Sequence, residues 1–149
     1  MAEADKFETY LISMAETYVK RFMADKLDEK MCYHNLNHTL EVVEAAEIIG
    51  RGCKLNEDEL EQVIIAAWFH DIGYYNGRED HELQSAELAR SFLIKTSFPA
   101  YKIENVCSSI LATKIPQSPK NLLEQVLCDA DLYHLSTEKF FEKEKPFIN

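Results

Sequence analysis

The sequence predicts an all-α fold, a single-domain bundle of about six helices. Its 149 residues include only four glycines and four prolines, so residues that interrupt helices are scarce. Apolar residues recur at spacings of three and four, the period of a helix, and no segment alternates as a strand would. A chain of this length suits one domain with a single sizeable core.

Two helices are predicted in the first third of the chain. Residues 5–27 carry one apolar stripe, formed by Phe7, Leu11, Met14, Tyr18 and Phe22. After an irregular start, a second helix begins near Asn37. It continues to Gly50 and Gly52, which we interpret as its C-terminal caps.

The third predicted helix is the most apolar. Asn56, with Glu59 three residues later, resembles a capping box and marks the start of this helix. The helix runs through the uninterrupted apolar segment 63–69, which predicts that it is buried. It ends on His70 and Asp71, an imidazole and a carboxylate that are unusual residues to follow a buried run.

Three further helices are predicted after a loop at 73–80. A loop at 115–120 precedes the last of them, and Pro99 suits the first turn of the middle one. We expect these helices at residues 81–96, 98–114 and 121–136, with another turn or two at 137–145. The abrupt ending, in a charged tail that contains three phenylalanines, suggests a chain truncated at Asn149.

The composition excludes several classes of partner. A formal net charge of −10 argues against non-specific binding of nucleic acids and against docking on anionic membranes. It does not exclude a phosphorylated substrate, because a bound cation can reverse the local field. The scattered cysteines form no C-x-x-C pair and no signal peptide or membrane span is visible, so a cytoplasmic protein is expected. The oligomeric state is left open.

Histidines and aspartates, which are common metal ligands, lie in or beside the predicted helices. His34 and His38 are four residues apart, so they face the same way if that segment is helical. His70 and Asp71 follow the third helix, and Asp131 lies in the last one, two residues after Asp129. Each residue alone has an ordinary structural explanation, such as a satisfied histidine or a solvated carboxylate. Together they indicate a mixed imidazole and carboxylate metal site, because buried charge is costly unless it is paired or bound to a metal.

These residues lie in motifs that resemble a known family. The segments YHN-x-x-HT, FHDIGY, SAELA and LCDADL occur in this order, and they are similar to those of the HD superfamily of metal-dependent phosphohydrolases. The likeness is greatest to small predicted HD phosphohydrolases of bacteria, and the YHN-x-x-H segment also resembles that of cyclic-nucleotide phosphodiesterases. The resemblance to the HD superfamily covers most of the chain and implies one HD-type helical bundle over residues 1–149.

The resemblance implies roles for individual residues. His38, His70, Asp71 and Asp131 would be the metal ligands, and Asp71 would also bridge to a second ion if one binds. His34 matches the histidine that protonates the leaving oxygen in the phosphodiesterases, and imidazole suits this step near neutral pH. Asn35 would support the site by hydrogen bonding.

One tightly held divalent ion is favoured over two. Members of the family with two metals often add histidines, but Thr113 stands where one of these is expected. His81, Glu82 and Asp129 are the candidates for a second ion or for supporting contacts, although His81 and Glu82 equally suit a solvated first turn of a helix. The donors accept Mn, Fe, Ni, Co, Zn or Mg. Lys114 and Arg78 are the candidates for binding the charge of the substrate, and each also suits a surface position.

The leading hypothesis is hydrolysis of a phosphoester or phosphoanhydride, most simply of a nucleotide. In this mechanism the metal activates a water, with Asp71 and His34 as the catalytic residues. The main alternative is a regulatory module that senses a nucleotide without turnover. A metal-dependent oxygenase and a structural helical domain without metal are further alternatives.

Overall fold

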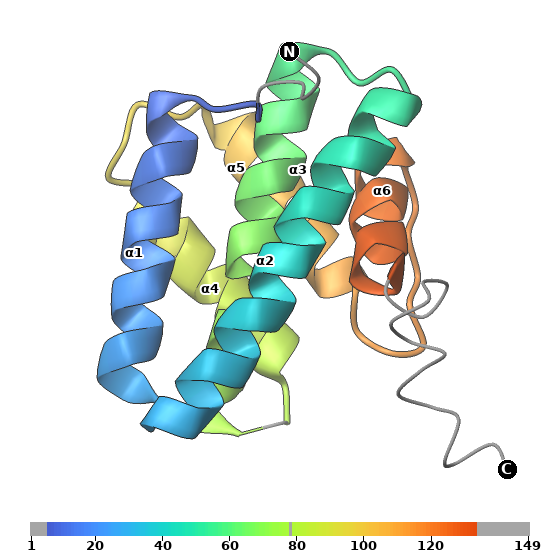
Figure 1. Ribbon diagram of the computed structural model, residues 1–149. Coiled ribbons are helices and arrows are strands. Elements are labelled where there is room, and N and C mark those ends of the chain that lie inside the picture. Colours follow the sequence, from blue (N-terminus) through green and yellow to red (C-terminus); the bar gives the residue numbers. More distant parts are fainter. Residues whose placement is uncertain (1–5, 78, 134–149) are drawn as a thin grey trace, which may run out of the picture.

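The computed structural model describes residues 6–77 and 79–133, and the predicted all-α fold is confirmed there (Figure 1). These residues form six α-helices and one short 3₁₀ helix, η1, and they contain no strand. The elements are α1 (Tyr10–Lys26), α2 (Glu29–Gly52), α3 (Glu57–Phe69), η1 (Ile72–Asn76), α4 (His81–Leu93), α5 (Ala100–Ala112) and α6 (Leu122–Asp131). Arg78 and the predicted turns at 137–145 lie outside the described residues.

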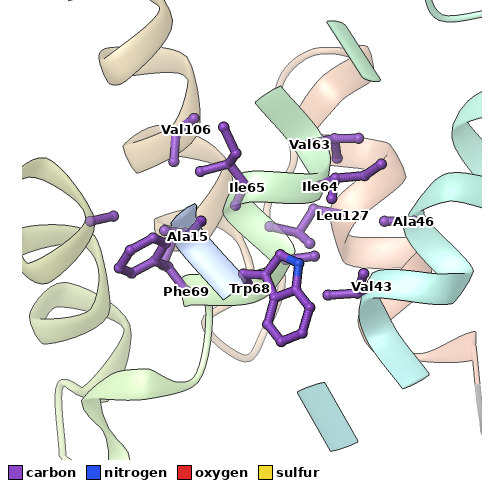
Figure 2. Close-up of a cluster of buried hydrophobic side chains, with 14 of the residues drawn as sticks. Ala15, Val43, Ala46, Val63, Ile64, Ile65, Trp68, Phe69, Val106 and Leu127 are labelled. Atoms are coloured by element: carbon purple, nitrogen blue, oxygen red, sulfur yellow. The ribbon is translucent and has the colours of Figure 1, made fainter. Parts of the chain in front are cut away.

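Helix α3 is the central element of the bundle. It packs against α1, α2, α5 and α6, and Figure 1 shows it enclosed among them. Every residue from Gln62 to Phe69 is buried, including the large side chains of Trp68 and Phe69 (Figure 2). A helix that is apolar all round requires protein on every side, and the surrounding helices provide it.

The start of α3 is the predicted capping box. The Asn56 side chain accepts a hydrogen bond from the Glu59 backbone at 2.8 Å. The Glu59 carboxylate accepts one from the Asn56 backbone at 2.9 Å. Two backbone donors that no helical carbonyl can reach are thereby satisfied.

Helix α2 begins earlier than the predicted Asn37. Asp28 is its N-cap and accepts a hydrogen bond from the backbone of Met31 at 2.8 Å, so the helix starts at Glu29. The segment that contains His34 and His38 is therefore helical throughout. Because they are four residues apart, the two histidines lie one turn apart on the same side of α2.

The interpretation of Gly50 and Gly52 as C-terminal caps is wrong. Both glycines lie within α2, which Cys53 caps, and the left-handed residue that follows is Lys54 (φ 64°). Gly50 instead allows close packing, because a Cβ there would lie 2.8 Å from Cδ1 of Leu60 on α3. The absence of a side chain at Gly50 thus serves a contact between helices.

Gly73 lies in the connection between α3 and α4 and packs closely against the start of α4. Ile72–Asn76 forms η1 within what was predicted to be a loop. The Gly73 backbone donates a hydrogen bond to the Ser85 hydroxyl at 2.8 Å. A Cβ on Gly73 would lie 2.3 Å from the carbonyl oxygen of His81 and 2.8 Å from the backbone nitrogen of Ser85. Only glycine therefore fits between η1 and the first turn of α4.

Gly73→Ala is expected to lower the free energy of unfolding by about 3 kcal/mol, because the added methyl group meets backbone atoms that cannot move aside cheaply. In a domain of this size the melting temperature should fall by about 6–12 °C. Gly52→Ala is the matched control, since a Cβ there meets nothing within 4 Å. This control should be neutral or stabilising by up to about 1 kcal/mol. Thermal unfolding of both variants measures the difference, and equal melting temperatures would contradict the contact.

The four cysteines are free thiols. Cys107 and Cys128 are buried, and burial raises the pKa of their thiols to about 11 and about 12, respectively. Cys32 is half-buried and Cys53 is exposed. Within the described parts of the chain, no helix is both long enough and apolar enough to cross a membrane.

Candidate metal centre

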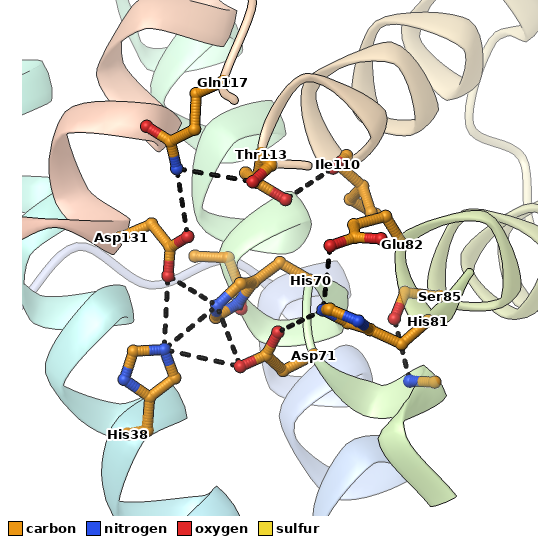
Figure 3. A network of polar contacts seen from close by, with 12 residues as sticks. His38, His70, Asp71, His81, Glu82, Ser85, Ile110, Thr113, Gln117 and Asp131 are labelled. Carbon is orange, nitrogen blue, oxygen red and sulfur yellow. Dashed lines mark hydrogen bonds and ion pairs between the residues drawn. The ribbon is translucent and has the colours of Figure 1, made fainter. Parts of the chain in front are cut away.

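Two imidazoles and two carboxylates, contributed by α2, the end of α3 and α6, lie close together in the bundle (Figure 3). Oδ1 of Asp131, at the end of α6, lies 3.2 Å from Nε2 of His38 on α2 and 3.2 Å from Nε2 of His70. Oδ2 of Asp71 lies 3.4 Å from Nε2 of His38 and 3.5 Å from Nε2 of His70. The two Nε2 atoms are 3.4 Å apart. The structure thus brings together all four residues that the resemblance implies as metal ligands.

The end of α3 orients His70. Its side chain is only 1% exposed, and the residue caps α3 with helical backbone angles. Nδ1 lies 2.8 Å from the Ala67 carbonyl oxygen, which can only accept, so Nδ1 carries a proton. This bond turns Nε2 toward the carboxylates, as expected for a histidine whose second nitrogen is to bind a metal.

Opposite charges stabilise one another in this centre. Burial alone would lower the pKa of His70, but Asp71 and Asp131 outweigh it and raise that pKa to about 10. Burial would raise the pKa of Asp71, yet His70 and the other imidazoles nearby hold that pKa below its ordinary value. The pKa of Asp131 is lowered in the same way, against burial, by hydrogen bonds from His38 and His70. In the metal-free protein an imidazolium therefore neutralises part of the carboxylate charge.

The metal-free protein is expected to lose stability as the pH rises from about 7 to about 10. The pKa of His70 is raised from 6.5 to about 10 on folding, so its stabilising contribution is complete below pH 6.5 and is lost as the pH approaches 10. Folding lowers the pKa values of Asp71 and Asp131. These two residues therefore stabilise the folded protein above their ordinary pKa, and this stabilisation is lost only in acid. Thermal unfolding at a series of pH values measures the trend.

The same ionisation predicts that metal affinity increases with pH. A cation that binds near neutral pH must displace the proton on Nε2 of His70, because only the neutral imidazole is a ligand. Calorimetry in buffers of different ionisation enthalpy should therefore detect about one proton released per ion at pH 8. Binding without proton release would contradict an imidazolium at this position.

A second polar group adjoins the first through Asp71. Oδ1 of Asp71 lies 3.4 Å from Nε2 of His81, and the same nitrogen lies 3.1 Å from Oε2 of Glu82. Tyr74 stacks on the His81 ring, with the ring centroids 4.1 Å apart. Glu82 is 8% exposed, so the alternative of a solvated first turn does not hold. One carboxylate thus faces both groups, through a different oxygen for each.

Asp129 does not join either group. It is exposed and accepts a hydrogen bond from Gln125 at 2.9 Å, one turn earlier on α6. Two residues along a helix correspond to a rotation of about 200°, so Asp129 and Asp131 point to opposite sides of α6. The structure therefore does not support Asp129 as a ligand or as a supporting contact.

Three other predicted site residues, His34, Asn35 and Lys114, are among the described residues. His34 is exposed, with its ring centroid 6.1 Å from that of Tyr33. Asn35 is half-buried, and its Nδ2 is buried without a hydrogen-bond partner among the described residues. Nζ of Lys114 lies 3.7 Å from Oδ1 of Asp80, the residue before His81, and both of these side chains are largely exposed.

Sequence reasoning missed Gln117. Its Nε2 lies 3.2 Å from Oδ2 of Asp131 and 3.4 Å from the carbonyl oxygen of Thr113. Gln117 belongs to the proline-containing loop between α5 and α6, where a polar residue is normally solvated. No spacing in the sequence distinguishes it from Gln125.

The donors fit a divalent cation. Ligand bonds of about 2.0–2.2 Å place neighbouring donors about 2.8–3.6 Å apart in octahedral or tetrahedral coordination. The nitrogen and oxygen distances of 3.2–3.5 Å around His38 and His70 fall in this range. His38, His70 and Asp71 each offer one ligand atom within 4.8 Å of the others. Imidazole with carboxylate is a donor set that suits first-row transition metals.

Three comparisons relate the chain to known proteins. A family model described as HD domain matches residues 35–136. An uncharacterized protein of Clostridium beijerinckii is 32% identical over 105 residues, which are 68% of this chain and 66% of that protein. The crystal structure of a predicted HD superfamily hydrolase from an uncultured Thermotogales bacterium is similar, with a TM-score of 0.71 and 22% identity over 93% of this chain and 82% of that one. At 22% identity, the similarity to this crystal structure shows only that the two chains share a fold.

Proposed function

The chain belongs to the HD domain family, and from the convergence of its histidines and aspartates we propose that it is a metal-dependent phosphohydrolase. The observation that carries the proposal is the meeting of His38, His70, Asp71 and Asp131 at one point. We propose as its substrate a phosphoester or phosphoanhydride of small size, most simply a nucleotide. The likeness of the YHN-x-x-H segment to that of cyclic-nucleotide phosphodiesterases supports this choice.

The four converging residues would hold the cation by Nε2 of His38 and His70, Oδ2 of Asp71 and Oδ1 of Asp131. A bound divalent ion supplies charge to polarise a phosphoryl oxygen and lowers the pKa of water from about 15.7 to about 7. The ions Mn, Fe, Ni, Co, Zn and Mg all suit these donors. Oδ1 of Asp71, with His81 and Glu82, would hold a second ion if one binds.

His34 is proposed as the general acid. It lies one turn before His38 on α2, so it is on the same side of the helix as a metal ligand while its ring is open to solvent. A ring nitrogen of His34 would donate a proton to the leaving oxygen as the bond to phosphorus breaks. Asp71 would contribute to catalysis as a ligand of the cation, because its Oδ2 lies 3.4 Å from Nε2 of His38 and 3.5 Å from Nε2 of His70.

Three further residues, Asn35, Lys114 and Arg78, are proposed to bind the substrate. Nδ2 of Asn35 is buried and has no hydrogen-bond partner among the described residues, and it is proposed to donate to a phosphate or sugar oxygen when substrate binds. Lys114 pairs with Asp80 beside His81, so a substrate phosphate would compete with Asp80 for its ammonium group. Arg78 remains a candidate for the same role.

The same converging histidines and aspartates also suit the second candidate function, a module that binds a nucleotide without turnover. A sensor would need the metal ligands but not an acid. The two functions differ in one measurable respect, the release of phosphate or of the alcohol from a bound ligand.

Elemental analysis followed by a substrate panel tests the proposal. Purified protein should contain a divalent metal in about stoichiometric amount. With added Mn or Ni, it should hydrolyse at least one member of a panel of nucleoside phosphates, cyclic nucleotides and aryl phosphates. Nucleotides that raise the melting temperature without being hydrolysed would instead support the sensing module. Protein that takes up no metal would contradict both functions.

A further inference from the structure

We propose that Gln117 is a positioning residue of the metal centre, one that holds Asp131 with a single oxygen toward the cation. This inference rests on the proposed function, because it concerns the same ligand set. Within the described part of the chain, the hydrogen bonds of the Gln117 side chain go to Thr113 and Asp131 and not to an imidazole. Gln117 acts through Asp131, the ligand that α6 contributes.

The orientation of the Gln117 amide follows from its partners. Nε2 lies 3.2 Å from Oδ2 of Asp131 and 3.4 Å from the carbonyl oxygen of Thr113 (Figure 3). Both partners only accept hydrogen bonds, whereas the amide nitrogen has two protons to donate. Turning the amide over would place its oxygen against two acceptors, so only one orientation is stable.

This contact divides the two oxygens of Asp131 between different partners. Oδ2 accepts from Gln117, while Oδ1 lies 3.2 Å from Nε2 of His38 and 3.2 Å from Nε2 of His70. Asp131 is the last residue of α6, so the helix does not continue beyond it to hold the side chain. A donor on Oδ2 therefore restricts rotation of the carboxylate and keeps Oδ1 as the ligand atom.

The loop that carries Gln117 is itself anchored at both sides. The Thr113 hydroxyl donates to the carbonyl oxygen of Ile110 at 2.7 Å, which fixes the end of α5. The Ser118 backbone donates to the carbonyl oxygen of Ala112 at 3.1 Å, on the other side of Gln117. An anchored loop can transmit a fixed position to the side chain it carries.

The neutral charge of the Gln117 amide matters as well. A lysine or arginine on Oδ2 would add positive charge beside the cation and oppose its binding. An amide supplies the hydrogen bond and leaves the whole carboxylate charge to the metal. Gln117 thus combines fixed geometry with little electrostatic cost.

The test compares Gln117→Met with Gln125→Met. Both changes remove an amide that donates to an aspartate of α6, but the partner of Gln125 is the exposed Asp129, away from the centre. Calorimetry with Mn²⁺ should show a roughly 10–100-fold weaker Kd for Gln117→Met and an unchanged Kd for Gln125→Met. The visible spectrum of bound Co²⁺ should also change only for Gln117→Met, because the coordination by Asp131 is altered.

A second variant and the melting temperature keep the test decisive. Gln117→Asn keeps the amide but is one methylene group too short to reach Asp131, so it should weaken Mn²⁺ binding in the same direction. If Gln117→Met does not fold, this variant replaces it. Lower melting temperatures with unchanged Kd and Co²⁺ spectrum would show a merely structural role and overturn the inference.

The two proposals can fail separately. If wild-type protein binds Mn²⁺ and hydrolyses no substrate, the phosphohydrolase proposal fails, while weaker binding by Gln117→Met still supports the positioning role. If wild-type protein is active and Gln117→Met binds Mn²⁺ equally well, only the positioning role is overturned. Wild-type protein that binds no Mn²⁺ or Co²⁺ overturns both.

Discussion

His70→Ala is expected to abolish both stoichiometric metal binding and hydrolysis. Nε2 of His70 lies 3.2 Å from Asp131 and 3.5 Å from Asp71, so this ring supplies a donor in the middle of the centre. Residues that only support a ligand typically contribute about 10–100-fold to metal affinity, and a ligand itself should contribute more. Elemental analysis after purification, together with turnover at saturating Mn²⁺, measures the loss.

Folding must be measured alongside, because His70 also neutralises charge. Without its imidazole, Asp71 and Asp131 remain as largely buried carboxylates, and removal of one partner from a buried ion pair costs about 3–5 kcal/mol. The variant should therefore be compared with wild type by circular dichroism and thermal unfolding before its metal content is interpreted. A folded His70→Ala protein that retains the wild-type metal content would contradict the assignment of the centre.

His34→Ala is expected to keep the metal and to lower kcat by roughly 10²–10⁴-fold, the usual contribution of a general acid. The loss should be large for substrates with an alkoxide leaving group. It should be small for nitrophenyl esters, because a good leaving group departs without a proton. Rates measured across leaving groups of different pKa therefore report the protonation step itself.

Glu44→Ala is a suitable control, since Glu44 is an exposed residue of the same helix. It should change neither metal content nor rate. An unchanged rate for His34→Ala with a poor leaving group would show that the acid is another residue. Loss of metal from His34→Ala would show that His34 is instead a ligand.

Local patterns in the sequence were sufficient for the all-α fold. The helical period and the scarcity of glycine and proline predicted the bundle, and the pairing of Asn56 with Glu59 predicted where α3 starts. The start of α2 was missed, because the residues between Asp28 and Asn37 are largely exposed and show a weak apolar pattern. The helix starts there because Asp28 is the N-cap, whose side chain accepts a hydrogen bond from the Met31 backbone.

Features that depend on a partner far along the chain could not be predicted. The role of Gly50 depends on the close approach of Leu60 on another helix, and the role of Gln117 depends on its hydrogen bond to Asp131. The residue types at the metal centre were apparent from the motifs, whereas their separation depends on how α2, α3 and α6 pack. The motif resemblance identified Asp131 as the ligand, but it left Asp129 as a supporting candidate, and only the rotation of α6 removes Asp129 from the centre.

The enclosure of α3 has a consequence for how this family can vary. Each residue of a helix advances the chain by about 1.5 Å and turns it by about 100°. A single insertion or deletion between Gln62 and Phe69 would therefore move every buried side chain out of register and turn His70 and Asp71 away from α2 and α6. Length changes should be confined to connections without a proposed site residue, such as 94–99, and related chains should preserve the number of residues in α3 even where its side chains differ.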